Sequence, residues 1–197
     1  AWAQRFMLTL DPHRMHFLSS DATEFMEHAD LLADRTKGDV GIEFHVFERF
    51  QVRLRENAEL ITMLLITRHD FSINESVSLE HVKYAVDKAE NDDRWRRRIK
   101  YELLMEDPRN PNSESSHAFL VARYSTISKH VQSLGQPDVV SLYIDALAKS
   151  FDGDSAFYSE AYLAMFRTGL ISNYTIGLII DYRRGDLWIT RSTHGGR

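Results

Sequence analysis

The sequence predicts a mainly α fold: a multi-helix domain followed by a short β-hairpin at the C-terminus. Three observations predict it. Apolar residues recur at helical spacings through most of residues 1–166. Gly, Pro, Asn and Ser gather between these segments, where helices end. Beyond residue 174 the helical period gives way to β-branched and apolar residues around a turn-like Arg-Arg-Gly-Asp, which indicates two strands.

Length and composition exclude several classes. The chain has 197 residues, 43% of them hydrophobic, which is enough for a proper core. Its net charge of −5 gives no general attraction to nucleic acid or to an anionic membrane, so we expect neither partner. The absence of cysteine excludes disulfides and thiol catalysis. No apolar run approaches the ~20 residues of a membrane span. With neither an initiator Met nor a signal peptide, the chain is expected to be a processed product or an expressed segment.

The first half of the chain predicts three helices. Asp11-Pro12 ends the first, and Asp21 with Glu24 predicts a capping box that opens a second helix to about residue 33. The third and longest is expected over residues 42–67. The apolar residues that define the faces of the first and third helices are Trp2, Phe6, Met7, Leu10, Val46, Phe50, Leu54, Ile61 and Leu65.

The second half predicts shorter elements. Ser78 is expected to cap a helix over residues 79–89, and Asp92-Asp93 to start another. Residues 107–116 form a predicted loop, and a helix over 117–134 is expected to close at Gly135. Further helices are expected over 138–149 and 156–166, and strands over 174–181 and 187–190. This organisation predicts a helical domain over residues 1–167 and a hairpin segment over 168–197. The predicted core contains Phe50, Leu54, Ile61, Trp95, Leu103, Tyr124, Ile127 and Ile144.

Three groups of residues are candidates for a binding function. His13 and His16 have a spacing that metal ligands use, but no third ligand is tied to them, so surface or half-buried histidines are the preferred interpretation; His45 is treated in the same way. The basic run at 94–98 has the composition of a phosphate-binding helix. A buried Trp95 with solvated arginines explains it equally well, because acidic residues flank it. The Arg-Gly-Asp triplet beginning at Arg184 is best explained as a hairpin turn.

Nucleophile, phosphate-loop and metalloprotease motifs are absent from the sequence. Serine and histidine are plentiful, but no spacing joins them into a triad. The sequence therefore predicts no catalytic, cofactor-binding or metal-binding residue, and no cofactor.

Read as ordered blocks, the chain resembles the N-terminal region of the tail-specific (carboxy-terminal processing) protease family. The first blocks of the resemblance are Leu10-Asp11 with Phe17-Leu18-Ser19-Ser20-Asp21 and Glu24-Phe25, then Asp39 with Phe47-Glu48-Arg49-Phe50 and Arg53. The later ones are Trp95-Arg96 with Lys100 and Glu102-Leu103-Leu104, then Arg123-Tyr124, then Ala146-Leu147-Ala148 through Phe151-Asp152 with Ser155, Tyr158-Ser159 and Phe166. The strand at 174–180 with Ile176-Gly177 resembles the first strand of the protease body, and Gly195-Gly196 falls where the family enters its PDZ module.

The chain also differs from the family pattern. It has Asp152-Gly153-Asp154 where the family tends to have Asp-Pro-His, and Tyr158-Ser159-Glu160 where the family tends to have Leu-Ser-Pro. The family's glycine-rich strand keeps only Gly177.

The resemblance implies a non-catalytic part of a serine endopeptidase that processes exported proteins from their C-termini in the bacterial periplasm, with a Ser/Lys dyad beyond the PDZ module. No position here matches that dyad, so the chain alone is expected to be inactive. Its implied role is to scaffold the PDZ and catalytic modules and to dock polypeptide substrates or a protein adaptor. The alternative is a self-contained helical interaction domain with no protease parent. Residues 174–190 are apolar on both strand faces, so they are expected to pack and pair with strands beyond residue 197 in the parent protease. In the isolated chain they are expected to self-associate.

Overall fold

The computed structural model describes residues 2–32, 41–79, 81, 83–167, 178–183 and 186–192. It divides the chain into two compact units, residues 1–157 and 158–197. The first unit contains helices α1 (Trp2–Leu10), α2 (Ser19–Leu32), α3 (Ile42–Ile66), α4 (Lys88–Glu106), α5 (Glu114–Ser133) and α6 (Gln136–Phe151). The prediction of a mainly helical fold is confirmed for the described residues.

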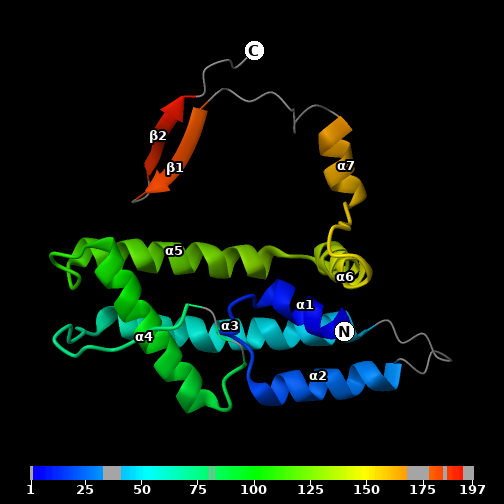
Figure 1. The fold of residues 1–197 in the computed structure, drawn as a ribbon, viewed down its shortest axis with the longest axis horizontal. Coiled ribbons are helices and arrows are strands. Elements are labelled where there is room, and N and C mark those ends of the chain that lie inside the picture. Colours follow the sequence, from blue (N-terminus) through cyan, green and yellow to red (C-terminus); the bar gives the residue numbers. More distant parts are fainter. Residues whose placement is uncertain are drawn as a thin grey trace. The chain divides into compact units, whose positions relative to one another are not determined.

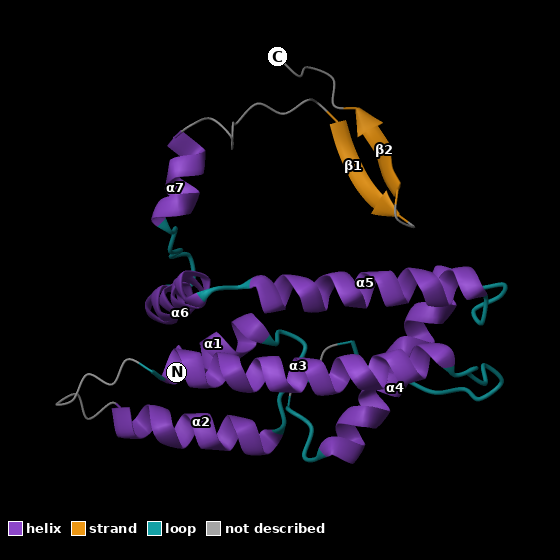
Figure 2. Ribbon diagram, turned by 180° about the vertical axis from the view of Figure 1, so that it is seen from behind, coloured by secondary structure: helices purple, strands orange, loops and turns teal. Residues whose placement is uncertain are grey.

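Helix α3 is the axis of the first unit. Its 25 residues span about 37 Å, and it contacts each of the other five helices of the unit. Figures 1 and 2 show α2 and α5 alongside α3 on different sides, with α4 crossing its C-terminal half. The apolar side chains of α3 therefore pack against two groups of helices.

Two hydrophobic clusters form the core. The first joins α1, α2 and α6 to the N-terminal half of α3, with Phe6, Phe25 and Phe50 at its centre. The second joins α4 and α5 to the C-terminal half of α3, with Trp95, Ile99 and Leu103 fully or almost fully buried. Of the predicted core, Phe50, Leu54, Ile61, Trp95 and Leu103 are buried; Tyr124 and Ile144 are half-buried, and Ile127 is 43% exposed.

The separate helix predicted over residues 79–89 is wrong. The described residues 79, 81 and 83–87 are not helical, and α4 begins at Lys88 because the Asp87 side chain accepts the Glu90 backbone N–H at 2.9 Å. The backbone carbonyls of the segment are used by distant residues instead: Ala85 O accepts from Ser19 N at 2.8 Å, and Tyr84 O from the Ser19 hydroxyl at 3.1 Å. Tertiary hydrogen bonds thus replace the helical ones.

Two helix ends also differ from prediction. Helix α5 ends at Ser133 with Leu134 as its C-cap, and Gly135 is the N-cap of α6 with φ −90°, so its freedom to adopt positive φ is not used. Helix α5 begins earlier than expected because the Ser113 side chain accepts the Ser116 backbone N–H.

The second unit holds α7 (Glu160–Arg167) and the antiparallel strands β1 (Leu178–Arg183) and β2 (Asp186–Ser192). The pairing joins Arg183 to Asp186 and shows a register irregularity between Ile179 and Ile180. Residues 174–177 and the centre of the predicted turn, 184–185, lie outside the described residues, as does the Arg-Gly-Asp triplet in part. The two units divide between residues 157 and 158, and the expected domain boundary after Arg167 stays a prediction.

Candidate functional site

The segment between α1 and α2 is held rigidly by one buried carboxylate. Asp11 is 1% exposed, and its two oxygens accept the backbone N–H groups of Met15, His16 and Phe17 at 2.9, 2.8 and 3.0 Å. The Met15 carbonyl in turn accepts the indole N–H of Trp95 at 2.8 Å. Residues 11–18, called the wall segment below, are therefore held against α3 and α4.

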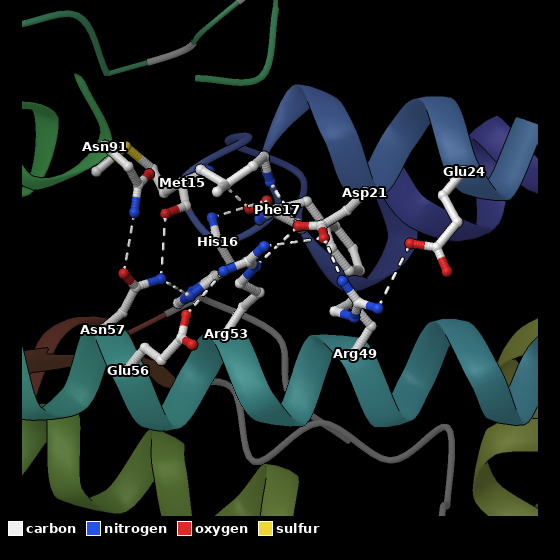
Figure 3. Close-up of polar contacts among 12 residues, drawn as sticks. Met15, His16, Phe17, Asp21, Glu24, Arg49, Arg53, Glu56, Asn57 and Asn91 are labelled. Carbon is white, nitrogen blue, oxygen red and sulfur yellow. Dashed lines mark hydrogen bonds and ion pairs between the residues drawn. The ribbon is translucent and has the colours of Figure 1, made fainter. Parts of the chain in front are cut away.

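A second buried carboxylate joins α2 to α3 (Figure 3). Asp21 accepts the Leu18 backbone N–H at 2.9 Å, Arg49 Nη1 at 2.9 Å, and Arg53 through Nε at 2.8 Å and Nη2 at 3.0 Å. Burial acts to raise the pKa of Asp21, but the hydrogen bonds from Arg53 and Leu18 and the two positive charges hold it below its ordinary value. Asp21 is thus a brace between helices.

This geometry corrects the predicted capping box. The helix begins at Ser19, two residues before the predicted cap, so Asp21 is the residue that reaches back to the helix start rather than the cap itself. Glu24 instead lies 3.0 Å from His45 Nε2 and 3.4 Å from Arg49 Nη2. The Asp21 carboxylate therefore accepts the Leu18 N–H at the start of α2 and also pairs α2 with the two arginines of α3.

An amide chain connects α4, α3 and His16 (Figure 3). Asn91 Nδ2 donates to Asn57 Oδ1 at 3.0 Å, and Asn57 Nδ2 lies 3.0 Å from His16 Nδ1. Because Asn57 Nδ2 also faces the Met15 carbonyl at 3.4 Å, it is the donor, so His16 Nδ1 accepts and its Nε2 carries the proton. Burial lowers the pKa of His16, although the Asp11 carboxylate acts in the opposite direction.

The basic run at 94–98 is engaged within the protein. Trp95 is 5% exposed, which confirms its predicted burial. Arg94 pairs with Glu90 and donates to the Lys83 carbonyl at 3.0 Å. Arg96 pairs with Glu75 and Asp93, and Arg97 also pairs with Asp93. The arginines are therefore ion-paired rather than simply solvated, and most of their charge is compensated.

A pocket of about 280 Å³ opens where the wall segment, α3, α4 and α5 meet. Its inner surface is apolar, and its polar lining comes from three separate parts of the chain: the α1–α2 segment, α4 and α5. The residues that line it include Leu54, Ile61, Trp95, Ile127, His13, His16, Arg98, Glu102, Arg123 and Tyr124. It is a candidate binding site because apolar surface and convergent polar groups occur together in a concave region.

The two candidate histidines of the sequence both line this pocket, but they do not form a metal site. His13 is exposed and His16 is half-buried with one ring nitrogen bonded to Asn57. Among the residues that the structure describes, no group of three or more His, Cys, Asp or Glu side chains is arranged to hold a metal ion. His45 contacts Glu24, as described above, and its ring packs edge-on against Phe25.

From the sequence, Ser128 had no predicted role, Arg98 appeared only in the basic run at 94–98, and Glu102 and Arg123-Tyr124 appeared only in the family blocks. The four-residue spacing of Arg98 and Glu102 predicts an ion pair on one helix face, and their nitrogen and oxygen lie 2.5 Å apart. Nothing in the spacing could place α5 against them, because that juxtaposition is tertiary.

Comparison with known proteins decides the family. The profile of the family described as "Tail specific protease N-terminal domain" matches residues 1–161. The chain belongs to this family.

The resemblance read from the sequence blocks is therefore confirmed. This tail-specific protease N-terminal domain is also similar to a curated relative, the "Tail-specific protease" of the bacterium Haemophilus influenzae, with 22% identity over 181 residues. The alignment covers 90% of this chain and 25% of the relative, so the chain spans about a quarter of that protein's length. Within the described part of the chain, no helix is long and apolar enough to cross a membrane.

Proposed function

We propose that this chain is the non-catalytic scaffold of a tail-specific serine endopeptidase, acting on exported proteins in the periplasm. The observation that supports it is the family match over residues 1–161, on a helical body braced by buried ion pairs rather than built around a reactive group. A Ser/Lys dyad and a PDZ module would be supplied by the longer protease. On this proposal the 197-residue chain alone cleaves no polypeptide.

Exposed aromatic side chains support a scaffolding role. Phe151 ends α6 with 82% of its surface exposed, and Phe157, at the end of the first unit, is 37% exposed. The two residues are six positions apart in the chain, and an exposed apolar patch is typical of a surface that another part of a protein covers. We propose that the rest of the protease packs against these residues, and that polypeptide substrates or an adaptor dock on the helical body so anchored.

The test compares two exposed apolar residues in two proteins. Phe151→Ser and, as the matched control, Ile66→Ser at the end of α3, which is 79% exposed, are made in this chain and in the full-length protease. In this chain neither variant should change the thermal midpoint by more than about 2 °C, because exposed positions contribute little to stability. In the full-length protease only Phe151→Ser should lower the midpoint and the rate of cleavage of an unfolded polypeptide with an apolar C-terminus.

Equal behaviour of the two variants in the full-length protein would refute the scaffold surface. Cleavage by the 197-residue chain alone, abolished by mutation of one of its serines, would refute the non-catalytic role. The alternative function, a self-contained interaction domain, predicts that the 197-residue chain binds its partner with no contribution from a PDZ or protease module. The family match favours the first function.

A further inference from the structure

The pocket between α3, α4 and α5 has an apolar interior. Leu54 and Ile61 of α3 and Trp95 of α4 line it and are 5%, 4% and 5% exposed. Ile127 of α5 lies at its edge with 43% of its surface exposed, which is why its predicted burial in the core is wrong. An apolar group entering the pocket would be removed from water on several sides.

Hydrogen-bond donors exceed acceptors around this interior. Arg98 uses Nε for Glu102, at 2.5 Å, and its terminal guanidinium nitrogens have no acceptor among the described residues. Arg123 Nη1 lies 3.6 Å from Glu102 Oε2, which is an ion pair too long for a hydrogen bond. The proton on His16 Nε2 also meets no acceptor in the described part of the chain.

The acceptors of the same surface are already engaged. Glu102 is 7% exposed and accepts from Arg98 and, at 2.8 Å, from the hydroxyl of Tyr124. Asp11 uses both oxygens for backbone N–H groups. The two carboxylates of the lining therefore have their oxygens occupied, and the guanidinium groups of Arg98 and Arg123 keep hydrogen-bond donors that these acceptors do not use.

The volume limits what can enter. Liquid water occupies about 30 Å³ per molecule, so 280 Å³ holds a ligand of about ten non-hydrogen atoms. Arg side chains are suited to the planar, two-oxygen geometry of a carboxylate. The apolar interior and the donor-rich rim together favour a small molecule with one apolar and one anionic end.

We propose that this pocket binds a monocarboxylate joined to one compact apolar group. The carboxylate accepts from Arg98, Arg123 and His16, and the apolar group lies on Leu54, Ile61 and Trp95. This chemistry is shared by free small acids and by the last residue of a polypeptide. The proposal does not depend on the scaffold function.

A titration of the ¹⁵N-labelled 197-residue chain tests it. The indole N–H signal of Trp95 is the reporter, and that of Trp2, which packs on Tyr143 in the other core cluster, is the internal control. Addition of 4-phenylbutyrate should shift the Trp95 signal with a saturable dissociation constant on the order of 1 mM, as expected for a ligand of about a dozen atoms. The uncharged 4-phenylbutyramide should bind at least about tenfold more weakly, because it lacks the charge-assisted bonds.

Matched variants locate the site. Arg123→Gln should weaken 4-phenylbutyrate about tenfold, and Arg55→Gln, at an exposed position of α3 outside the pocket, should leave binding unchanged. Ile127→Trp should fill the entrance and abolish the Trp95 shift. Thermal unfolding checks that each variant is folded.

A second arm distinguishes the two sources of the carboxylate. The peptide Gly-Gly-Phe is compared with its C-terminal amide and with 4-phenylbutyrate. If the peptide binds more tightly than 4-phenylbutyrate and the amide does not bind, the ligand is the end of a polypeptide. If the peptide binds more weakly than 4-phenylbutyrate, the ligand is a free small acid. The proposal is overturned if 4-phenylbutyrate and its amide bind equally well to the unmodified chain. It is also overturned if the Trp2 signal shifts together with that of Trp95. Equal effects of Arg123→Gln and Arg55→Gln overturn it as well.

Discussion

Replacing Asp21 with Ala should be among the most destabilising changes in the helical body. The carboxylate is 0% exposed and connects the start of α2 to two arginines of α3. Its removal leaves the Leu18 N–H without its acceptor, which costs about 1 kcal/mol, as loss of a helix cap does. It also leaves Arg49 and Arg53 facing an apolar methyl group.

The free-energy cost of removing the carboxylate from Arg49 and Arg53 can be bounded. Breaking a fully buried ion pair costs about 3–5 kcal/mol, because a charge is left uncompensated. The side chains of Arg49 and Arg53 are 32% and 18% exposed and keep Glu24 and Glu56 as partners, so water and these carboxylates recover part of this loss. We therefore expect Asp21→Ala to lower the free energy of unfolding by about 2–4 kcal/mol in total. Asp21→Asn keeps an oxygen for the Leu18 N–H and should lose about 1 kcal/mol less.

Urea titration followed by circular dichroism measures the loss, with Glu56→Ala as control. Glu56 also pairs with Arg53, at 2.9 Å, but is 46% exposed at its side chain, so its removal should cost no more than about 1 kcal/mol. Since the folded pKa of Asp21 lies below its ordinary 3.8, its contribution is complete above that value and is lost as the pH falls below it. The gap between wild type and Asp21→Ala should narrow near pH 3. A loss for Asp21→Ala no larger than for Glu56→Ala would refute the brace.

Three further predictions concern the core, the histidines and the C-terminal segment. Trp95→Ala should cost about 3–5 kcal/mol in denaturant titration, and Trp95→Phe less; a loss below about 1 kcal/mol for the alanine variant would contradict its burial. Burial lowers the pKa values of His16 and His69 below the ordinary 6.5, so stability should be full above pH 6.5 and fall as the pH drops below it; urea midpoints equal at about pH 7.5 and 5.5 would contradict this. Sedimentation should show self-association of the full chain but not of a version ending at Arg167; monomers in both cases, with strong amide protection in the strands, would contradict it.

Elements with a strong local signal could be predicted from the sequence. The spacing of Val46, Phe50, Leu54, Ile61 and Leu65 predicted α3 to within one residue of its observed end, because a long amphipathic stripe allows one period only. The family blocks were recognisable for a related reason. Several of their residues, such as Asp21, Arg53 and Trp95, make the contacts that hold the helices together.

Other features depended on partners far away in the chain. Residues 79–89 were predicted to be helical, but the carbonyls of residues 83–85 accept hydrogen bonds from Ser19 and Arg94. No local sequence pattern indicates these distant partners. Ile127 has the apolar character of a core residue, yet it borders a pocket that is also lined by His13, more than a hundred residues earlier in the chain. The sequence by itself determined most of the helical segments and the family that they resemble, since periodicity and caps act within a few residues. Only the tertiary structure decided which buried carboxylates brace the helices and where the donor-rich pocket opens, because desolvation and hydrogen-bond balance depend on groups brought together by folding.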